Sequence, residues 1–220
     1  MGATEDVGLD VEIVRRDCVI AGGGPAGLMA GYLLARRGLH VTVLEKHADF
    51  LRDFRGDTIH PSTISLLGEL GLRERFLDLP VTRLSTLDAV IDGRRLTMVD
   101  FSTLQPPDNF LVLAPQWHFL DFLARETRAY PGFELRMCTE ANEIVTDGDR
   151  VIGVRASGTD GGVERKIEFH APLTVAADGR SSQIRHAAGL TPVELGVAID
   201  VLWFSLPKPP NPPPSTLGYL

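Results

Sequence analysis

Cysteine is scarce in this sequence: two residues, Cys18 and Cys138, occur among 220. Both lie in apolar runs, and neither has a cysteine or histidine nearby at a metal-ligand spacing. This pattern argues against a disulfide framework and against a zinc site, and it is typical of reduced core thiols in a cytosolic protein. We therefore expect a cytoplasmic location and no metal site.

Positive charge and long apolar runs are lacking as well. The formal net charge is −7, whereas nucleic acids and anionic membranes are bound through basic patches, so neither is expected as a partner. No apolar run approaches the ~18 residues of a membrane span. Residues 1–16 have no basic start followed by an apolar stretch, so no signal peptide is expected.

The stretch from Cys18 to His47 predicts a βαβ unit. A short apolar strand, "DCVIAG", leads into a glycine cluster, and apolar residues then recur at helical spacing from Pro25 until Gly38. A second apolar strand, "HVTVLEK", follows. A strand, a helix and a strand within about 30 residues form a βαβ unit, whose two strands are parallel.

The rest of the chain alternates between helical and β-rich segments. Residues up to about Glu12 look like a loose tail, "STISLLGELGL" and "RERFLDL" predict helices, and "APQWHFLDFLARETRAYPG" predicts an amphipathic helix. Two β-rich runs around "DGRR" predict a hairpin. The segments "FELRMC", "ANEIVTD", "RVIGVRAS" and "VERKIEFHA" predict a meander, because turn signals separate them. A strand "LTVAADG", a short helix "SSQIRHAAGL", a strand "GVAIDVLWFSLP" and a proline-rich segment end the chain.

Gly22, Gly24 and Gly27 form a G-x-G-x-x-G pattern directly after the first strand. Gly22 would permit the tight turn, Gly24 would let a diphosphate approach the backbone, and Gly27 would let the helix pack close to the strand. Pro25 suits the first helical turn, and the helix N-terminus attracts an anion. A purely structural turn is the alternative.

Glu45 ends the second predicted strand, roughly 20 residues after the first glycine, where a carboxylate can accept hydrogen bonds from a ribose diol. It would repel a 2′-phosphate, so an unphosphorylated adenosine is expected. These residues do not distinguish NAD from FAD, because both present ADP to such a site.

Two further segments favour FAD. "FRGDTIHPSTISLLGELGL" places Arg55 before a helix, and "TVAADGRSSQIR" places Asp178, Gly179 and Arg185 after a strand. With the glycine motif and Glu45, they resemble the FAD-dependent aromatic hydroxylases of the p-hydroxybenzoate hydroxylase type, the single-component flavoprotein monooxygenases. The resemblance extends over essentially the whole chain.

The resemblance implies roles for particular residues. Glu45 would hold the adenosine ribose, Arg55 would lie near the flavin or nicotinamide phosphates, and Gln116 would contact the flavin. Alternatively, Arg55 is a solvated loop charge, Gln116 a helix cap, and Asp178 a residue that orders a turn. The full set of expected cofactor-binding residues is Gly22, Gly24, Pro25, Ala26, Gly27, Glu45, Lys46, Arg55, Gln116, Asp178, Gly179 and Arg185; no catalytic residue is identified.

The resemblance also implies an α/β fold: a Rossmann-like FAD-binding domain with a parallel sheet, a β-meander crossover, and an inserted, mostly antiparallel and incomplete β substrate domain. The expected boundaries are a flexible tail at 1–14, the FAD-binding domain at 15–82 and 110–192, and part of the substrate domain at 83–109 and 193–220.

The implied activity is NAD(P)H-dependent hydroxylation of an aromatic or similarly electron-rich small molecule, with FAD as cofactor, O₂ as co-substrate and a flavin hydroperoxide as the oxygen donor. The family's third fingerprint, a Gly-Asp followed by small residues and a histidine, is absent from the sequence. The chain is therefore expected to represent the N-terminal portion of such an enzyme, to retain FAD weakly, and to act as a homodimer or with a C-terminal half. The alternatives are an inactive FAD-binding fragment and another FAD-dependent reductase or dehydrogenase on the same scaffold.

Overall fold

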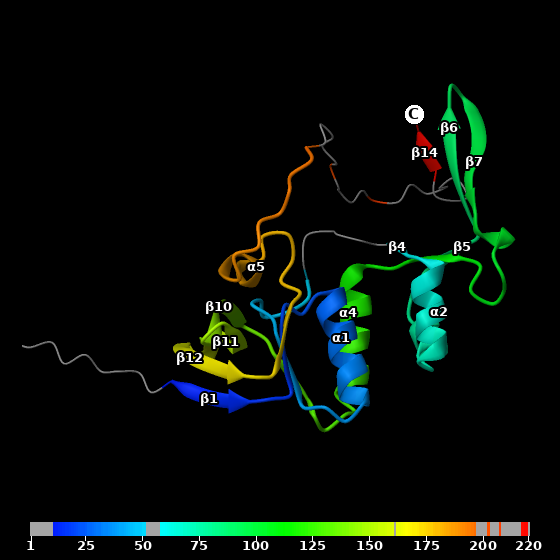
Figure 1. Ribbon diagram of the computed structural model, residues 1–220. Coiled ribbons are helices and arrows are strands. Elements are labelled where there is room, and N and C mark those ends of the chain that lie inside the picture. The colour runs from blue at the N-terminus through cyan, green and yellow to red at the C-terminus, as the bar shows by residue number, and fades with distance from the viewer. Residues whose placement is uncertain are drawn as a thin grey trace, which may run out of the picture. The chain divides into compact units, whose positions relative to one another are not determined.

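A computed structural model of the chain describes residues 11–51, 58–160, 162–196, 202, 207 and 217–219. The chain divides into two compact units (Figure 1). The first contains Met1–Leu51 and Leu120–Gly196, and the second contains Arg52–Phe119 and Val197–Leu220.

A four-stranded parallel sheet forms the centre of the first unit. Its strands lie in the order β13-β2-β3-β9, with bounds Leu173–Ala176, Cys18–Ala21, Val41–Leu44 and Phe133–Arg136. The helix α1 (Pro25–Arg36) connects β2 to β3. The predicted βαβ unit is therefore confirmed, and the burial of every side chain of β2 and β3 explains their uninterrupted apolar sequences.

The prediction that "FELRMC" begins the meander is wrong. β9 pairs in parallel with β3 and so belongs to the central sheet. A parallel neighbour requires a crossover connection, and the helix α4 (Gln116–Thr127), which directly precedes β9, lies within that connection.

The meander consists of three antiparallel strands, β10 (Thr139–Asp147), β11 (Arg150–Asp160) and β12 (Val163–His170). A fourth strand, β1 (Glu12–Arg15), pairs in parallel with β12. The expected tail at 1–14 therefore overlaps this strand. Its four residues, Glu12–Arg15, do not alternate between apolar and polar side chains, so the sequence did not indicate a strand there.

The meander covers one face of the parallel sheet, and α1 lies against the other; the meander strands and α1 are labelled in Figure 1. Val19 and Leu44 pack with Val154 and Phe169 of the meander in one buried cluster. On the opposite face α1 approaches closely, because a Cβ on Gly31 would lie 2.9 Å from a methyl of Val43. The central sheet is thus a buried layer, and its strand ends carry the residues considered below.

In its described residues, the second unit combines short helices with two small sheets. The helices are α2 (Pro61–Glu69) and α3 (Arg73–Leu77), followed later by the 3-10 helix η1 (Phe101–Thr103). The strands β4 (Thr58–Ile59), β8 (Leu111–Leu113) and β5 (Thr82–Leu84) form one antiparallel sheet. Arg73 donates a hydrogen bond of 2.7 Å to Asp108 and so ties α3 to the loop that precedes β8.

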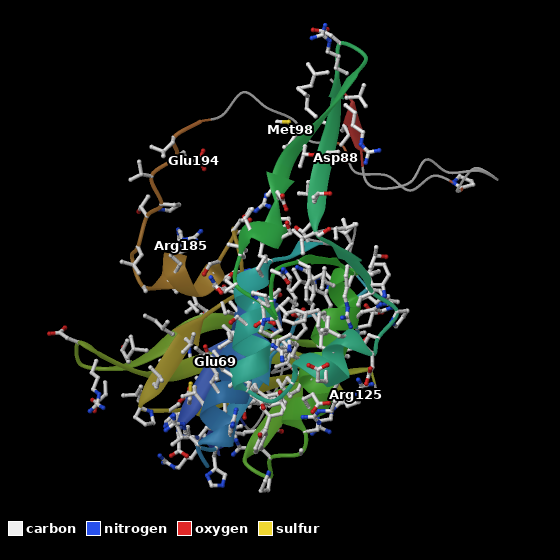
Figure 2. All side chains as sticks on the ribbon, turned by 90° about the vertical axis from the view of Figure 1, so that its right-hand side faces the viewer. Glu69, Asp88, Met98, Arg125, Arg185 and Glu194 are labelled. Carbon is white, nitrogen blue, oxygen red and sulfur yellow. The ribbon has the colours of Figure 1, made fainter. Side chains whose placement is uncertain are left out.

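The predicted hairpin is present as β6 (Thr86–Ile91) and β7 (Arg94–Asp100), on which Figure 2 labels Asp88 and Met98. Asp92 and Gly93 form the two-residue turn with φ values of 49° and 73°, as a type I′ hairpin turn requires. β14 (Leu217–Tyr219) pairs in parallel with β6. The strand predicted for "GVAIDVLWFSLP" lies almost entirely outside the described residues.

The helix α5 (Gln183–Ala187) follows β13 and ends near Gly189, whose φ is 72°. The arrangement is a mixed α/β fold with a parallel sheet, a meander and a separate antiparallel part, which confirms the predicted fold class.

Candidate functional site

The parallel sheet of the first unit has a topological switch point at β2. β3 lies on one side of β2 and β13 on the other, so the connections leave the sheet in opposite directions there. In open α/β sheets, ligands bind outside the carboxyl ends of the strands at such a point. The glycine turn follows β2, Glu45 follows β3, and Asp178 lies shortly after β13, so all three belong to this edge of the sheet.

Gly22 is in close contact with the turn after β13. Its φ is 102°, and a Cβ at this position would lie 2.3 Å from the carbonyl oxygen of Ala177 and 2.8 Å from the Cα of Asp178. Only glycine meets both conditions, since it lacks Cβ and tolerates positive φ. The structure therefore brings together two segments that are more than 150 residues apart in the sequence.

The N-terminus of α1 is suited to a diphosphate. Gly24 is the N-cap, no side chain caps the helix, and Pro25 and Ala26 begin its first turn. A Cβ on Gly27 would lie 1.9 Å from the carbonyl oxygen of Gly22, so close packing of the helix against the turn is enough to explain why residue 27 is glycine. Gly24 differs, because its φ is −74° and a Cβ there would meet no described atom within 4 Å. The space at Gly24, beside an uncapped helix N-terminus, fits an anionic group close to the backbone.

The Glu45 side chain is turned back onto the glycine turn. Its Oε2 accepts a hydrogen bond of 3.0 Å from the backbone N–H of Gly23, and its Oε1 accepts one of 3.0 Å from the N–H of His47. Glu45 is only 7% exposed. The carboxylate thus lies next to the N-terminus of α1. Sequence reasoning missed Gly23, although the run of three consecutive glycines was a visible signal.

Lys46 is more exposed than Glu45. Its ammonium nitrogen lies 3.6 Å from Oε1 of Glu140, and more than half of the Lys46 side chain is accessible. The ion pair is of the exposed kind, which contributes little to stability.

The turn after β13 is organised by Asp178. This carboxylate accepts a hydrogen bond of 2.5 Å from the Ser182 hydroxyl and one of 3.2 Å from the N–H of Ile184. Ser182 in turn caps α5 by accepting from the N–H of Arg185, at 2.9 Å. The Arg185 guanidinium donates to the carbonyl oxygens of Gly179 and Arg180. In this structure Asp178 and Arg185 therefore hold the turn, which itself contacts Gly22.

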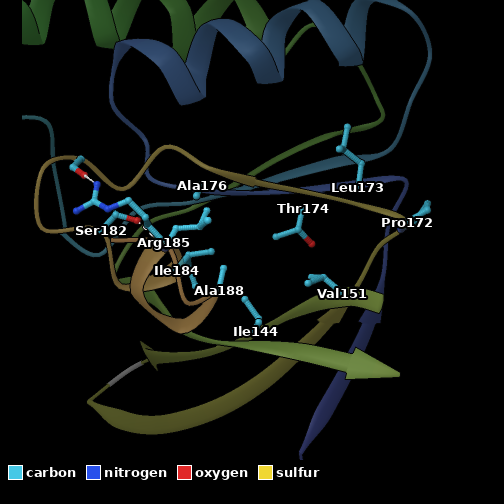
Figure 3. A pocket seen from close by; sticks show the side chains of 12 residues that line it. Ile144, Val151, Pro172, Leu173, Thr174, Ala176, Ser182, Ile184, Arg185 and Ala188 are labelled. Atoms are coloured by element: carbon cyan, nitrogen blue, oxygen red, sulfur yellow. Dashed lines mark hydrogen bonds between the residues drawn. The ribbon is translucent and has the colours of Figure 1, made fainter. Parts of the chain in front are cut away.

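A pocket of about 570 Å³ lies in the first unit beside β13 (Figure 3). Among the described residues no strand pairs with the outer edge of β13. The pocket is mainly apolar; the glycine turn and Glu45 do not line it, whereas Gly179 and Arg185 do. Its lining includes Ile144, Val151, Leu173, Thr174, Ile184 and Arg185.

The structure does not test two of the expected residues. Arg55 lies outside the described residues. Gln116 is the first residue of α4 and belongs to the second unit. Their predicted roles stay predictions.

The two cysteines are not paired. Burial raises the pKa of the Cys18 thiol to about 11, with a further contribution from the charge of Asp17. Cys18 therefore stays protonated near neutral pH and is unsuited to act as a nucleophile. The described part of the chain contains no group of three His, Cys, Asp or Glu side chains that could hold a metal ion. In the same residues, no helix is long and apolar enough to cross a membrane.

Comparison with known proteins gives consistent results. The family described as "FAD binding domain" matches residues 15–212. 6-Methylpretetramide 4-monooxygenase of Streptomyces rimosus is 36% identical over 196 residues, which are 88% of this chain and 46% of the relative.

Among the solved structures with this fold are two oxygenases. p-Nitrophenol 4-monooxygenase PnpA of Pseudomonas putida DLL-E4 matches with a TM-score of 0.70 and 25% identity, over 82% of this chain and 45% of that chain. The anhydrotetracycline hydroxylase OxyS of Streptomyces rimosus matches with a TM-score of 0.65 and 28% identity, over 80% of this chain and 34% of that chain. The present chain spans less than half the length of each of these three proteins.

Proposed function

The chain belongs to the FAD-binding domain family, and we propose that it is the cofactor-binding part of an NAD(P)H-dependent flavoprotein monooxygenase. Its substrate would be an aromatic or similarly electron-rich small molecule. The names of the three relatives, two 4-monooxygenases and a hydroxylase, support this class of reaction.

One observation carries the proposal. At the switch point of the sheet, an uncapped helix N-terminus with open space at Gly24 lies beside the carboxylate of Glu45. The ADP half of FAD has a diphosphate followed by a ribose diol, and these two chemical features match the two protein features in the same order. We assign the diphosphate to the backbone of Gly22, Gly24, Ala26 and Gly27, with Pro25 fixing the first turn, and the diol to Glu45.

The remaining assignments follow from position. Lys46 would contact the adenosine from the exposed side. Asp178 and Gly179 would form the opposite wall of the site, because Gly22 touches their turn, and Arg185 would act through the carbonyl oxygens that it holds. Arg55 and Gln116 would approach the cofactor from the rest of the chain.

When bound, FAD would accept a hydride from NAD(P)H and activate O₂. The overall reaction balances as substrate C–H, O₂, NAD(P)H and a proton giving C–OH, water and NAD(P)⁺. The residues of this chain hold and orient the cofactor in that scheme, since orientation and exclusion of water are what a protein contributes to such chemistry. None of the described side chains is assigned a catalytic role.

We assign residues 15–82 and 110–192 to FAD binding and 83–109 and 193–220 to part of a substrate domain. The boundaries between the two compact units differ from these: the second unit begins at Arg52, and the first unit resumes at Leu120. We further propose that the protein is cytoplasmic and acts as a homodimer or together with a C-terminal half.

The test is a comparison of FAD with FMN, which lacks the ADP half. Quenching of flavin fluorescence by the purified protein should show that FAD binds and that FMN binds at least about tenfold more weakly. FMN lacks the contacts of the ADP half, which include hydrogen bonds to charged groups. A Glu45→Gln variant should reduce this preference. Equal affinity for FAD and FMN, or no affinity for FAD, would contradict the proposal.

The class of reaction is tested with isotopic oxygen. The complete enzyme that contains this chain, supplied with FAD, NADH or NADPH, and a panel of phenols under ¹⁸O₂, should yield a product that carries one ¹⁸O atom per molecule. Oxidation of NAD(P)H with transfer of hydrogen but no ¹⁸O to any product would indicate a reductase instead.

A further inference from the structure

We infer that Gly23, the residue between the first two glycines of the motif, is a positioning residue: its backbone N–H holds the Glu45 carboxylate in the orientation in which it would receive the adenosine ribose. This inference rests on the proposed function, because it assumes that the adenosine end of the cofactor lies at Glu45.

Two backbone donors fix the orientation of the Glu45 carboxylate. The N–H of Gly23 donates to Oε2 and the N–H of His47 donates to Oε1, each at 3.0 Å. One donor belongs to the glycine turn and the other to the segment after β3, so the carboxylate joins the two. Backbone donors cannot rotate away as side chains can, and the acceptor is therefore oriented before a ligand arrives.

Glycine at position 23 is explained by the side chain of Glu45. A Cβ on Gly23 would lie 2.9 Å from Cβ of Glu45 and 3.1 Å from its Oε2. Gly23 is not among the glycines with positive φ. Its backbone conformation thus does not require glycine, whereas the contact with Glu45 does.

The Cβ of Glu45 is not free to move away. The N–H of Glu45 donates to the carbonyl oxygen of Arg136 at 2.8 Å, and its own carbonyl oxygen accepts from the N–H of Thr139 at 2.9 Å. Both bonds hold the backbone at the end of β3. A methyl group at position 23 must therefore displace either the carboxylate or the glycine turn, and in both cases the bond between Gly23 and Glu45 is lost.

Gly24 provides a matched control. A Cβ there meets no described atom within 4 Å, and its φ of −74° is accessible to alanine. Gly24→Ala adds the same methyl group one residue later, away from Glu45 and into the space assigned to the diphosphate. It should weaken the binding of every nucleotide diphosphate without changing the preference for ribose.

The experiment measures the affinities of ADP and 2′-deoxy-ADP by isothermal titration calorimetry. The unchanged protein should bind ADP roughly tenfold or more tightly than 2′-deoxy-ADP, as expected for a hydroxyl bonded to a charged acceptor. In Gly23→Ala this ratio should fall to within about twofold of one. In Gly24→Ala both affinities should fall, and the ratio should stay that of the unchanged protein.

A double-mutant cycle identifies the route of the effect. If Gly23 acts through Glu45, Gly23→Ala should not reduce the ratio further in a Glu45→Gln background, because coupled residues are not additive. A ratio in Gly23→Ala equal to that of the unchanged protein would overturn the inference and leave FAD binding in place. Equal binding of ADP and 2′-deoxy-ADP by the unchanged protein would overturn it as well. No binding of ADP at all would contradict the proposed function itself.

A second variant covers a failure of Gly23→Ala to fold. Replacing Glu45 by glycine removes the three atoms that lie nearest to the new methyl group, which are Cβ, Oε2 and Cγ of Glu45. Gly23→Ala combined with Glu45→Gly should therefore fold as well as Glu45→Gly alone. Failure of the combined variant to fold while Glu45→Gly folds would show that position 23 requires glycine for another reason, and would overturn the inference.

Discussion

Gly22 and Gly38 both have positive φ in the first unit, but they differ in their surroundings. Gly38, with a φ of 84°, would carry a Cβ with no described atom within 4 Å. Gly22, with a φ of 102°, would place a Cβ 2.3 Å from a backbone oxygen and 2.8 Å from a backbone carbon. Alanine substitution at the two positions therefore separates the cost of the backbone conformation from the cost of the close approach.

The expected magnitudes follow from these contacts. Gly38→Ala should lower the free energy of unfolding by about 1–2 kcal/mol, the cost of a left-handed conformation for an L-residue. Gly22→Ala should cost about 1–3 kcal/mol more, since the atoms that it meets are backbone and the turn after β13 has to move. The sum is a large share of the ~5–15 kcal/mol that typically stabilises a protein.

Urea unfolding followed by far-ultraviolet circular dichroism measures both variants under one protocol. ADP affinity supplies a second measurement, because displacement of the turn after β13 should weaken binding in Gly22→Ala and leave Gly38→Ala unaffected. Equal shifts of the urea midpoint for the two variants would refute the close approach of Gly22 to Ala177.

Two further predictions concern the first unit. Asp178→Ala removes the acceptor of the Ser182 hydroxyl and of the Ile184 N–H. The substitution should lower the free energy of unfolding, measured in urea, by about 1–3 kcal/mol. An unchanged urea midpoint would show that Asp178 does not hold the turn. The pKa of Glu168 is lowered by its hydrogen bond with His170 and further by Arg155, so its contribution to stability is present above the ordinary glutamate pKa and is lost as the pH falls through the lowered value. Melting temperatures between pH 7 and pH 3 should therefore fall less steeply for Glu168→Gln than for the unchanged protein, and equal slopes would contradict this linkage.

The βαβ unit could be predicted from sequence because its signals are local. The apolar run of β2, the glycine turn and the helical spacing of α1 follow one another within about 30 residues. The hairpin of β6 and β7 was predictable for the same reason, since Asp92 and Gly93 are a strong turn signal between two β-rich runs.

The pairing of strands distant in sequence could not be read in this way. "FELRMC" has the composition of a strand, but nothing in its residues tells whether it pairs with β10 or with β3. β1 and β14 pair with strands that are distant in the sequence, and short strands carry little pattern of their own.

The candidate site shows the same division. The glycines, Glu45 and Asp178 could be selected from sequence by their spacing and by the resemblance to a family. The contact between Gly22 and Ala177 and the bond between Gly23 and Glu45 depend on how the strand ends are arranged, so only the structure reveals them. The open space at Gly24 is a property of the same kind.

A crystal structure of the protein soaked or crystallised with FAD tests the central claim most directly. It should show the diphosphate at the N-terminus of α1, within hydrogen-bond distance of the backbone at Gly24, and the adenosine ribose with a hydroxyl bonded to the Glu45 carboxylate. FAD bound elsewhere, with Glu45 still turned onto Gly23 and the N-terminus of α1 free of phosphate, would contradict the assignment of this site.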